Sequence, residues 1–243
     1  MTRSDFNNLI TNNFQNAKCI WWFNVGLDFQ WDQKTLGFFP RIESADKMSV
    51  LGMEQMMLML ASKNDVVIMH RQPNEMICNN IREIFDGLPA ILTPANANNN
   101  QKSISEIILD DNKLIKILKD ISKESKTYLV PYAITKYENR IAELIGTEIV
   151  GPSYDLASWI NSKITARNIA RELDFDVTFG VECHSFEDLS DASNSIKSKH
   201  PECTMVLKDD YGASGKGLFF IKRKSDWDLV LHRANKLQKN DVA

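Results

Sequence analysis

The sequence lacks long hydrophobic runs and has little excess charge of either sign. None of its apolar runs approaches the roughly 20 residues that a membrane-spanning helix needs. Residues 1–16 are polar and rich in asparagine, without the apolar core of a secretory signal. The 29 basic and 32 acidic residues leave a net charge of −3, whereas nucleic-acid-binding proteins carry a basic face. These absences predict a cytoplasmic protein that binds neither a membrane nor nucleic acid.

Cysteine is also scarce, and the four cysteines form no C-x-x-C pair. This spacing gives no support to a disulfide framework or a thiolate zinc site. His184 and His200 lie near two of the cysteines, but adjacent residues in a strand point to opposite faces, so we expect no set of metal ligands. We expect all four to be buried apolar residues: Cys19, Cys78, Cys183 and Cys203.

Two common nucleotide-binding motifs are absent. No G-x-G-x-x-G follows an early strand, which removes the sequence support for a dinucleotide site and for a nicotinamide-dependent enzyme. The dipeptide Gly215-Lys216 fits a Walker A motif, but that motif also needs glycine where Asp210 stands and serine or threonine where Gly217 stands. A P-loop also opens a helix, whereas residues 218–221 form an apolar, strand-like run. The P-loop is therefore excluded.

A glycine-rich stretch is present at residues 211–217, between strand-like runs at 203–208 and 218–222. We predict that it forms the turn of a hairpin. Glycine permits positive φ and close approach of the backbone to a ligand, and successive exposed amides form an anion-binding concavity. With Lys208 and Lys216 alongside, the predicted ligand is a polyphosphate. The alternative is an ordinary hairpin whose glycines only shape the turn.

Strand-like and helical patterns alternate along the first 148 residues, which predicts a parallel sheet covered by helices. Pro131 suggests that its strand lies at an edge or bends, and Gly146 is the favoured C-terminal cap of a helix. His70 and Arg71 follow a strand, and they either reach a cleft or begin a solvated loop. The predicted strands are 19–25, 66–69, 90–93 and 128–134, and the predicted helices are 50–61, 74–85, 104–121 (as one helix or two) and 137–145.

A break in composition at residues 149–153 predicts a domain boundary after residue 148. The second domain, 149–243, again mixes helical and strand-like patterns, so both domains belong to the α/β class. The elements predicted for it are helix 155–173, strand 176–181, helix 186–198, the two hairpin strands and a last helix from residue 226.

The order of short motifs in the second domain resembles the first half of an ATP-grasp fold. The matching strings are Asn161-Ser162-Lys163, residues 171–177, Val206-Leu207-Lys208 and the glycine loop. The resemblance implies that two lysines contact the phosphates or the adenine side of ATP, and that the glycine hairpin closes over the triphosphate. Taken singly, each lysine is most simply a solvated surface residue. The implied nucleotide-binding residues are Lys163, Lys208, Gly212, Ala213, Ser214, Gly215, Lys216 and Gly217.

The resemblance also implies a role for the first domain. Residues 1–148 would form an α/β pre-ATP-grasp domain with a parallel sheet covered by helices, followed by the first α+β lobe at 149–243. The strings at 22–26 and 130–133 resemble this domain in peptide and acyl-carrier-protein ligases of natural-product biosynthesis. Asp209-Asp210 departs from the family pattern, because two carboxylates repel phosphates unless a cation or Lys216 intervenes. Alternatively, the two aspartates only form a turn.

By the same resemblance, the chain would belong to a ligase that uses ATP and Mg²⁺ to join a carboxylate to an amine through an acyl phosphate, giving an amide or peptide bond. Its partners would be ATP, a carboxylate substrate and an amine acceptor. Whether a carrier protein holds either substrate is left open. The catalytic residues stay unassigned, because no residue stands out as a general base. The second lobe, which holds Mg²⁺ in this family, is absent from the sequence.

We therefore expect the N-terminal part of a longer ligase, inactive by itself. The alternative is a noncatalytic nucleotide-binding or protein-interaction module derived from the same fold. A chain without its partner lobe would expose an apolar patch, so a homodimer is one expected state.

Overall fold

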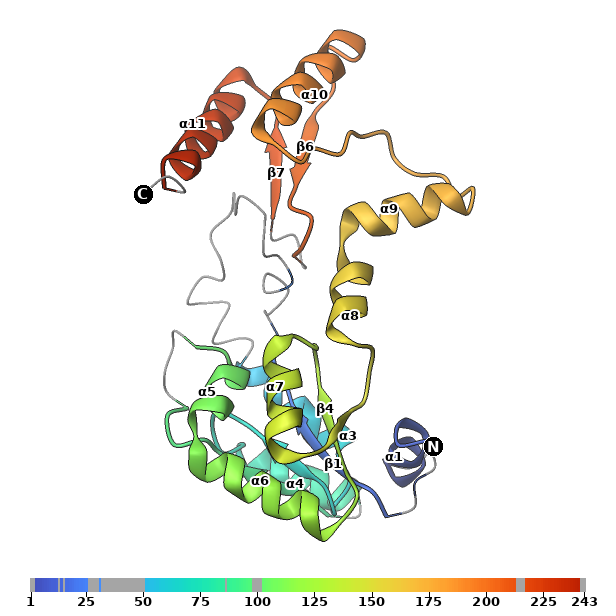
Figure 1. Ribbon diagram of the computed structural model, residues 1–243, viewed down its shortest axis with the longest axis vertical. Coiled ribbons are helices and arrows are strands. Elements are labelled where there is room, and N and C mark those ends of the chain that lie inside the picture. Colours follow the sequence, from blue (N-terminus) through green and yellow to red (C-terminus); the bar gives the residue numbers. More distant parts are fainter. Residues whose placement is uncertain are drawn as a thin grey trace. The chain divides into compact units, whose positions relative to one another are not determined.

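The computed structural model describes residues 3–12, 14, 16–25, 31, 51–85, 87–97, 102–212 and 217–240. The chain forms two compact units, whose elements are labelled in Figure 1. The first comprises Met1–Leu27 with Ile42–Ala157, and the second comprises Asp28–Arg41 with Ser158–Ala243. The units thus divide within α8 (Tyr154–Asn161), whereas the domain boundary after residue 148 stays a prediction.

The first unit is built on a five-stranded parallel sheet, which confirms the predicted α/β class. Its strand order is β3-β2-β1-β4-β5, so β1 lies at the centre. Ile20 of β1 is aligned with Val66 of β2 on one side and with Leu129 of β4 on the other. The strands are β1 (Lys18–Trp22), β2 (Val66–Ile68), β3 (Ala90–Leu92), β4 (Thr127–Pro131) and β5 (Glu148–Ile149).

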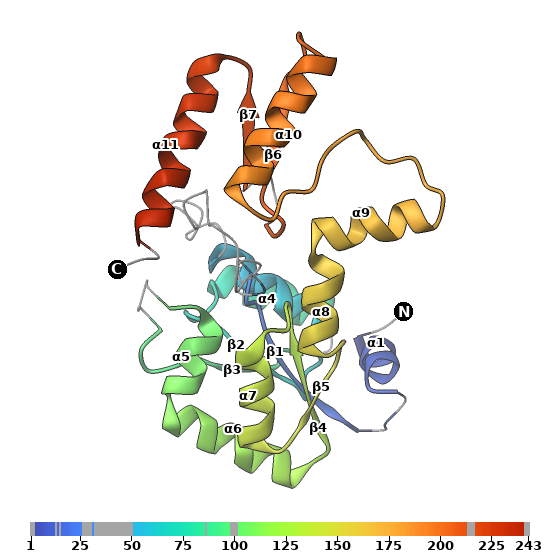
Figure 2. The same cartoon turned by 45° about the horizontal axis from the view of Figure 1, so that its top comes forward.

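Helices cover both faces of this sheet, and β1 contributes alternate side chains to the two apolar clusters. Ile20 and Trp22 pack on the side of α5, α6 and α7, which Figure 2 shows in front of the sheet. Cys19, Trp21 and Phe23 pack on the opposite side, with α3 and α4. The helices are α1 (Arg3–Ile10), the 3₁₀ helix η2 (Glu54–Met56), α3 (Met57–Leu60), α4 (Glu75–Ile84), α5 (Ile104–Asp110), α6 (Asn112–Glu124) and α7 (Lys136–Ile145).

Local capping explains where several of these helices begin and end. The apolar stripe of 104–121 forms two helices, because the Asp111 carboxylate caps α6 by accepting from the backbone N–H groups of Lys113 and Leu114, each at 3.0 Å. Hydrogen bonds from backbone N–H groups, that of Ala95 first, lower the pKa of Asp111. Gly146 ends α7 in the left-handed region at φ +74°, as predicted.

Of the two alternatives predicted for the strand with Pro131, an edge position or a bend, the edge position is wrong. β4 lies between β1 and β5, and Pro131 is its last residue, aligned with Trp22 of β1. The short strand β5 pairs only with Tyr128 and Leu129, so it ends before the proline. A missing backbone N–H at that position therefore removes no bond from the β4–β5 ladder.

A buried carboxylate ties α1, β1 and β2 together. Asp65 directly precedes β2 and is 1% exposed. Its Oδ1 accepts from the Cys19 N–H at 2.9 Å, and its Oδ2 accepts from the Trp21 indole at 3.2 Å. The same Oδ2 also accepts from Asn7 Nδ2 at 2.6 Å and from the Ser62 N–H at 2.7 Å. Four donors therefore satisfy a charge that is otherwise costly to bury.

We predict that Asp65→Asn lowers the free energy of unfolding by about 2–4 kcal/mol. In either orientation of the asparagine amide, its NH₂ group would face donors whose hydrogen bonds the Asp65 carboxylate accepts, so those hydrogen bonds would be lost. Asp120→Asn, at an exposed i,i+3 pair with Lys123, changes it by less than about 0.5 kcal/mol. Urea denaturation followed by circular dichroism measures both variants, and equal losses would contradict the role of Asp65.

Among its described residues, the second unit contains an antiparallel hairpin and three helices of its own. In the hairpin, Met205 is aligned with Ile221 and Lys208 with Leu218, which confirms the predicted hairpin. Several large apolar side chains of this unit are exposed, including the cross-strand pair Val206 and Phe220. A homodimer through such residues stays a prediction. The elements are β6 (Met205–Lys208), β7 (Leu218–Ile221), α9 (Lys163–Glu172), α10 (Phe186–Lys199) and α11 (Lys224–Asn240).

Two predictions for this unit are wrong. The expected helix 155–173 is interrupted at Ser162, whose hydroxyl accepts from the Thr165 N–H at 3.0 Å and caps α9. The expected strand 176–181 is absent from the described residues, where this segment is irregular. The carbonyl groups of Thr178 and Gly180 accept hydrogen bonds from the Arg167 guanidinium instead of from a neighbouring strand.

The cysteines fall into two environments. Cys19 and Cys78 are buried as predicted, but Cys183 is half-buried and Cys203 is exposed, so the prediction of burial is wrong for these two. Burial, reinforced by the nearby Asp65 carboxylate, raises the pKa of the Cys19 thiol from 9.0 to about 12. The reactive thiolate form of Cys19 is therefore almost unpopulated near neutral pH.

We predict that iodoacetamide at pH 8 alkylates Cys203 first and Cys19 last, because Cys203 is exposed whereas Cys19 is buried and keeps its proton. Mass spectrometry of tryptic peptides over time measures the two rates. In urea, where the burial is lost, the two rates should converge. Equal rates in the folded protein would show that β1 is not buried as described.

Candidate functional site

The glycine loop joins β6 to β7, and its base is closed by a backbone hydrogen bond from the Asp209 N–H to the Gly217 carbonyl at 2.8 Å. Gly212 and Gly217 have φ of +118° and +76°, a region that L side chains rarely adopt. A Cβ at Gly217 would lie 3.0 Å from Asp209 Cβ. Glycine is therefore required at Gly217 for both conformation and space. Four predicted binding residues lie outside the described residues: Ala213, Ser214, Gly215 and Lys216.

We predict that Gly217→Ala destabilises the hairpin by about 2–3 kcal/mol, through a strained φ together with the contact to Asp209. Gly146→Ala is the matched control, because Gly146 has nearly the same φ, +74°, and nothing within 4 Å of the added Cβ. Its cost should be about 1–2 kcal/mol. Hydrogen exchange of the hairpin and of α7 measures the two effects, and a smaller effect at Gly217 would contradict the tight loop base.

Lys163 reaches the glycine loop from the first position of α9. Its Nζ donates to the carbonyl oxygens of Asp210 at 3.0 Å and of Gly212 at 2.8 Å. Its backbone N–H also donates to the Asp210 carbonyl at 3.1 Å. Lys208 ends β6 and is exposed next to Asp209. The structure thus brings Lys163 to the described part of the loop and leaves the Lys208 side chain accessible to solvent.

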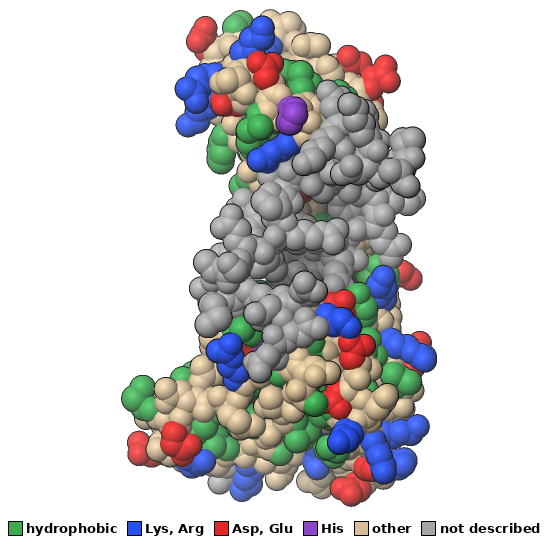
Figure 3. Space-filling view, turned by 90° about the vertical axis from the view of Figure 1, so that its left-hand side faces the viewer, with side chains coloured by type: hydrophobic (Ala, Val, Ile, Leu, Met, Phe, Trp, Pro, Cys, Tyr) green, Lys and Arg blue, Asp and Glu red, His purple; other side chains and the backbone are tan. Residues whose placement is uncertain are grey.

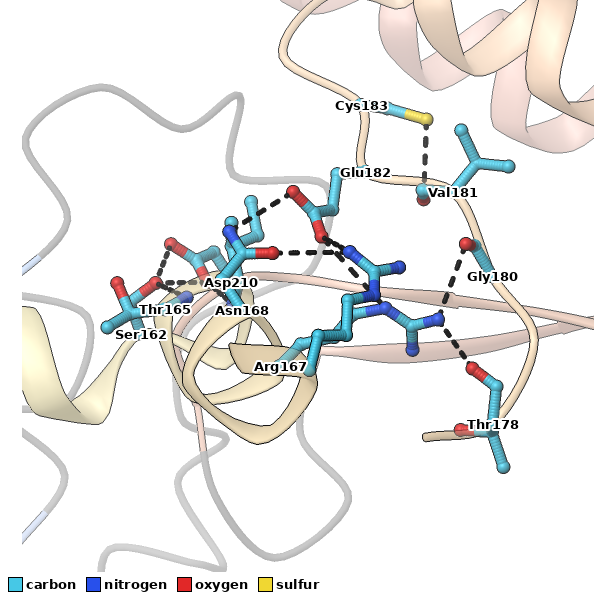
Figure 4. A network of polar contacts seen from close by, with 12 residues as sticks. Ser162, Thr165, Arg167, Asn168, Thr178, Gly180, Val181, Glu182, Cys183 and Asp210 are labelled. Atoms are coloured by element: carbon cyan, nitrogen blue, oxygen red, sulfur yellow. Dashed lines mark hydrogen bonds and ion pairs between the residues drawn. The ribbon is translucent and has the colours of Figure 1, made fainter. Parts of the chain in front are cut away.

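Asp210 occupies the N-terminus of α9, a role that the sequence did not reveal. Its carboxylate accepts from the Ser162 hydroxyl at 2.9 and 3.0 Å and from the Ile164 N–H at 2.9 Å. Figure 4 shows Asp210 beside Ser162 and Thr165. The partial positive charge of a helix N-terminus favours a carboxylate there. The sequence predicted that Asp210 either repels phosphate or forms a turn. Neither prediction included this contact with α9.

A second polar network holds residues 178–182 against α9. The Arg171 guanidinium donates to Glu182 at 2.7 Å, and Arg167 bonds the carbonyl groups of Thr178 and Gly180 (Figure 4). Asn168 completes the network with a contact to Glu182 at 3.5 Å. Because these arginines bond groups of their own unit, the simplest role of this network is to stabilise the irregular segment 178–182 against α9.

The sheet of the first unit offers less to a ligand at its carboxyl edge. Open α/β sheets bind ligands where the strand order reverses, here between β1 and β4. The buried Asn24 side chain fills that position, because its Nδ2 donates to the Ala133 carbonyl at 2.7 Å and to Glu138 at 2.9 Å. Its Oδ1 accepts from the Ala133 N–H at 2.7 Å. The polar groups at this position therefore satisfy one another.

His70 does not begin a solvated loop. Its backbone N–H donates to Glu54 Oε2 at 3.0 Å, and its Nδ1 contacts Glu54 Oε1. The two side chains are 10% and 3% exposed. His70 therefore forms a largely buried pair with Glu54, whereas Arg71 is exposed.

A hollow of about 780 Å³ lies at the amino-terminal edge of the same sheet, between the ends of α6 and α7. Its lining includes the surface ion pair Lys126–Glu148 and no residue of the glycine loop. The described residues contain no cluster of three His, Cys, Asp or Glu side chains suited to a metal ion. They also include no helix that is both long and apolar enough to cross a membrane. On the face drawn in Figure 3, acidic and basic side chains are interspersed.

Comparison with known proteins gives one relative that supports the prediction from sequence. No family model and no solved structure matches the chain. The butirosin acyl-carrier protein–L-glutamate ligase of Niallia circulans is 25% identical to it over 227 residues. The match covers 91% of this chain and 48% of that protein. The chain resembles an ATP-grasp ligase. It spans about half the length of the curated relative that it matches.

Proposed function

We propose that the chain is the N-terminal part of an ATP-dependent carboxylate–amine ligase that forms an amide or peptide bond through an acyl phosphate. One observation carries the proposal: the lysine implied by the ATP-grasp resemblance, Lys163, bonds the backbone of the glycine loop in the antiparallel hairpin. Residues far apart in the sequence thus meet, and their meeting supports the proposal. The match to a carrier-protein ligase supports the same class of reaction.

The triphosphate of ATP is proposed to bind at the glycine loop. Lys208 is exposed at the end of β6 and supplies a positive charge beside the loop. Gly212 and Gly217 give the loop ends the positive φ that lets backbone approach a phosphate closely. Lys163 fixes the loop through two carbonyl groups. Ala213 to Lys216 complete the proposed set by resemblance alone.

Mg²⁺ would neutralise the charge that develops on the phosphates during transfer. It takes oxygen ligands, and the described residues contain no cluster of three acidic or histidine side chains to hold it. We place its ligands in the second lobe of the ATP-grasp fold, as the resemblance implies. The residues of this chain would instead contribute lysine charges and backbone amides, which stabilise negative charge without covalent chemistry.

The proposed reaction has two balanced steps. A carboxylate oxygen attacks the γ-phosphorus of ATP, the bond to the β,γ-bridging oxygen breaks, and ADP leaves. The amine nitrogen then attacks the carbonyl carbon of the acyl phosphate and loses a proton, while inorganic phosphate leaves. The name of the relative mentions an acyl-carrier protein and L-glutamate. We accordingly propose that one substrate of this protein is an amino acid and that the other is carried on a carrier protein.

We predict that Lys208→Ala lowers ADP release about tenfold or more in the full-length protein supplied with Mg-ATP and amino acids, because a charge-assisted contact to phosphate is lost. Lys222→Ala, at another exposed lysine of the same unit, is the matched control and should leave the rate unchanged. Robust release that Lys208→Ala does not affect contradicts the assignment. Binding of ATP without any release, in an assay that also supplies the carrier-bound substrate, would instead support a noncatalytic module.

A further inference from the structure

The carboxylate of Asp210 is one half of a two-part anchor between the hairpin and α9. The side chain accepts from Ser162 and from the Ile164 N–H, while the backbone carbonyl of Asp210 accepts from the Lys163 N–H and Nζ. The partners are consecutive residues at the start of α9 and are nearly fifty positions away in sequence. A single residue thus connects the base of the glycine loop to the helix in two ways.

The electrostatics of this anchor compensate the negative charge of Asp210. The first N–H groups of a helix have no partners within the helix, and a carboxylate that accepts from them is stabilised by about 0.3–1 kcal/mol. The Ser162 hydroxyl supplies a further donor at 2.9 Å. The charge is therefore balanced by α9, and the repulsion of phosphate expected from the sequence is weakened.

The anchor also determines where Lys163 lies. The Lys163 Nζ bonds the carbonyl groups of Asp210 and Gly212, and both belong to the backbone that the Asp210 side chain attaches to α9. Without the side chain, the backbone at 210–212 would be held to α9 mainly through Lys163 itself. Holding a binding loop in place before the ligand arrives lowers the entropy lost on binding.

We propose that Asp210 is a positioning residue of the nucleotide site, which holds the backbone of residues 210–212 and Lys163 in the arrangement that accepts a polyphosphate. This inference rests on the proposed function of the hairpin and extends it to a residue that the resemblance does not assign. The sequence led us to expect that the Asp210 carboxylate opposes phosphate binding, whereas in this proposal Asp210 supports it.

The first experiment needs no ligand and examines the anchor alone. Hydrogen exchange of the 243-residue chain is compared for the wild type, Asp210→Ala, Asp210→Asn and Asp191→Asn. Asp191 lies on an exposed position of α10 and serves as the charge-matched control. We expect faster exchange at Ile164 and around residues 209–212 in Asp210→Ala. Asn should exchange at a rate between those of Asp210→Ala and the wild type, because it keeps an oxygen for the Ile164 N–H but lacks the negative charge. Unchanged exchange in Asp210→Ala overturns the anchor.

The second experiment titrates the same proteins with Mg-ATP and with inorganic triphosphate by calorimetry. Asp210→Ala should weaken binding about fivefold, the effect of losing one capping interaction of about 1 kcal/mol. Asp210→Asn should recover most of that affinity, since it keeps an oxygen for the Ile164 N–H. Tighter binding by Asp210→Asn overturns the proposal, because it would mean that the charge repels the phosphates. Unchanged binding by Asp210→Ala, with faster exchange, also overturns it.

The two experiments separate this inference from the proposed function. If Asp210→Ala exchanges faster but neither the wild-type chain nor the full-length protein binds nucleotide, then the anchor stands. The proposed function fails in that case, and the positioning of a nucleotide fails with it. If the wild type binds Mg-ATP and Asp210→Ala binds equally well, only the positioning role fails.

Discussion

The central strand β1 is the constraint on which the first unit depends. Its neighbouring residues point to opposite faces of the sheet, so Ile20 and Trp22 enter one apolar cluster while Cys19 and Trp21 enter the other. A shift of one residue in register would exchange the two sets. The buried Asp65 carboxylate opposes such a shift, because it bonds both the backbone of Cys19 and the indole of Trp21.

Most elements of the fold follow from local patterns, whereas the exceptions carry a weak local signal or depend on side-chain contacts that the pattern does not show. The helix ending at Gly146 was predictable because its cap is local. The strand β5 was missed because two residues carry almost no periodic signal. The apolar segment 176–181 has the composition of a strand, but Arg167 takes two of its carbonyl groups. Which donor a carbonyl meets is decided by tertiary structure.

The candidate site, like the fold, has parts that the local sequence predicted and parts that it did not. The hairpin around the glycine loop was visible in the sequence, since a run of glycines between two apolar strands is a local signal. The placement of Lys163 at the loop was implied only by resemblance, and Lys216 lies outside the described residues. Asp210 was misjudged because its partner, Ser162, is 48 residues earlier in the chain. Charge alone indicated repulsion, but the helix N-terminus changes that balance.

The contact between Asn24 and Ala133 has a consequence for folding during synthesis of the chain. Asn24 bonds Ala133, a residue 109 positions later, and β1 gains its neighbour β4 only when that part of the chain has been synthesised. Until then one long edge of the central strand stays open, and such edges are prone to pairing with other chains. The core of the first unit can therefore be completed only after β4 has been synthesised.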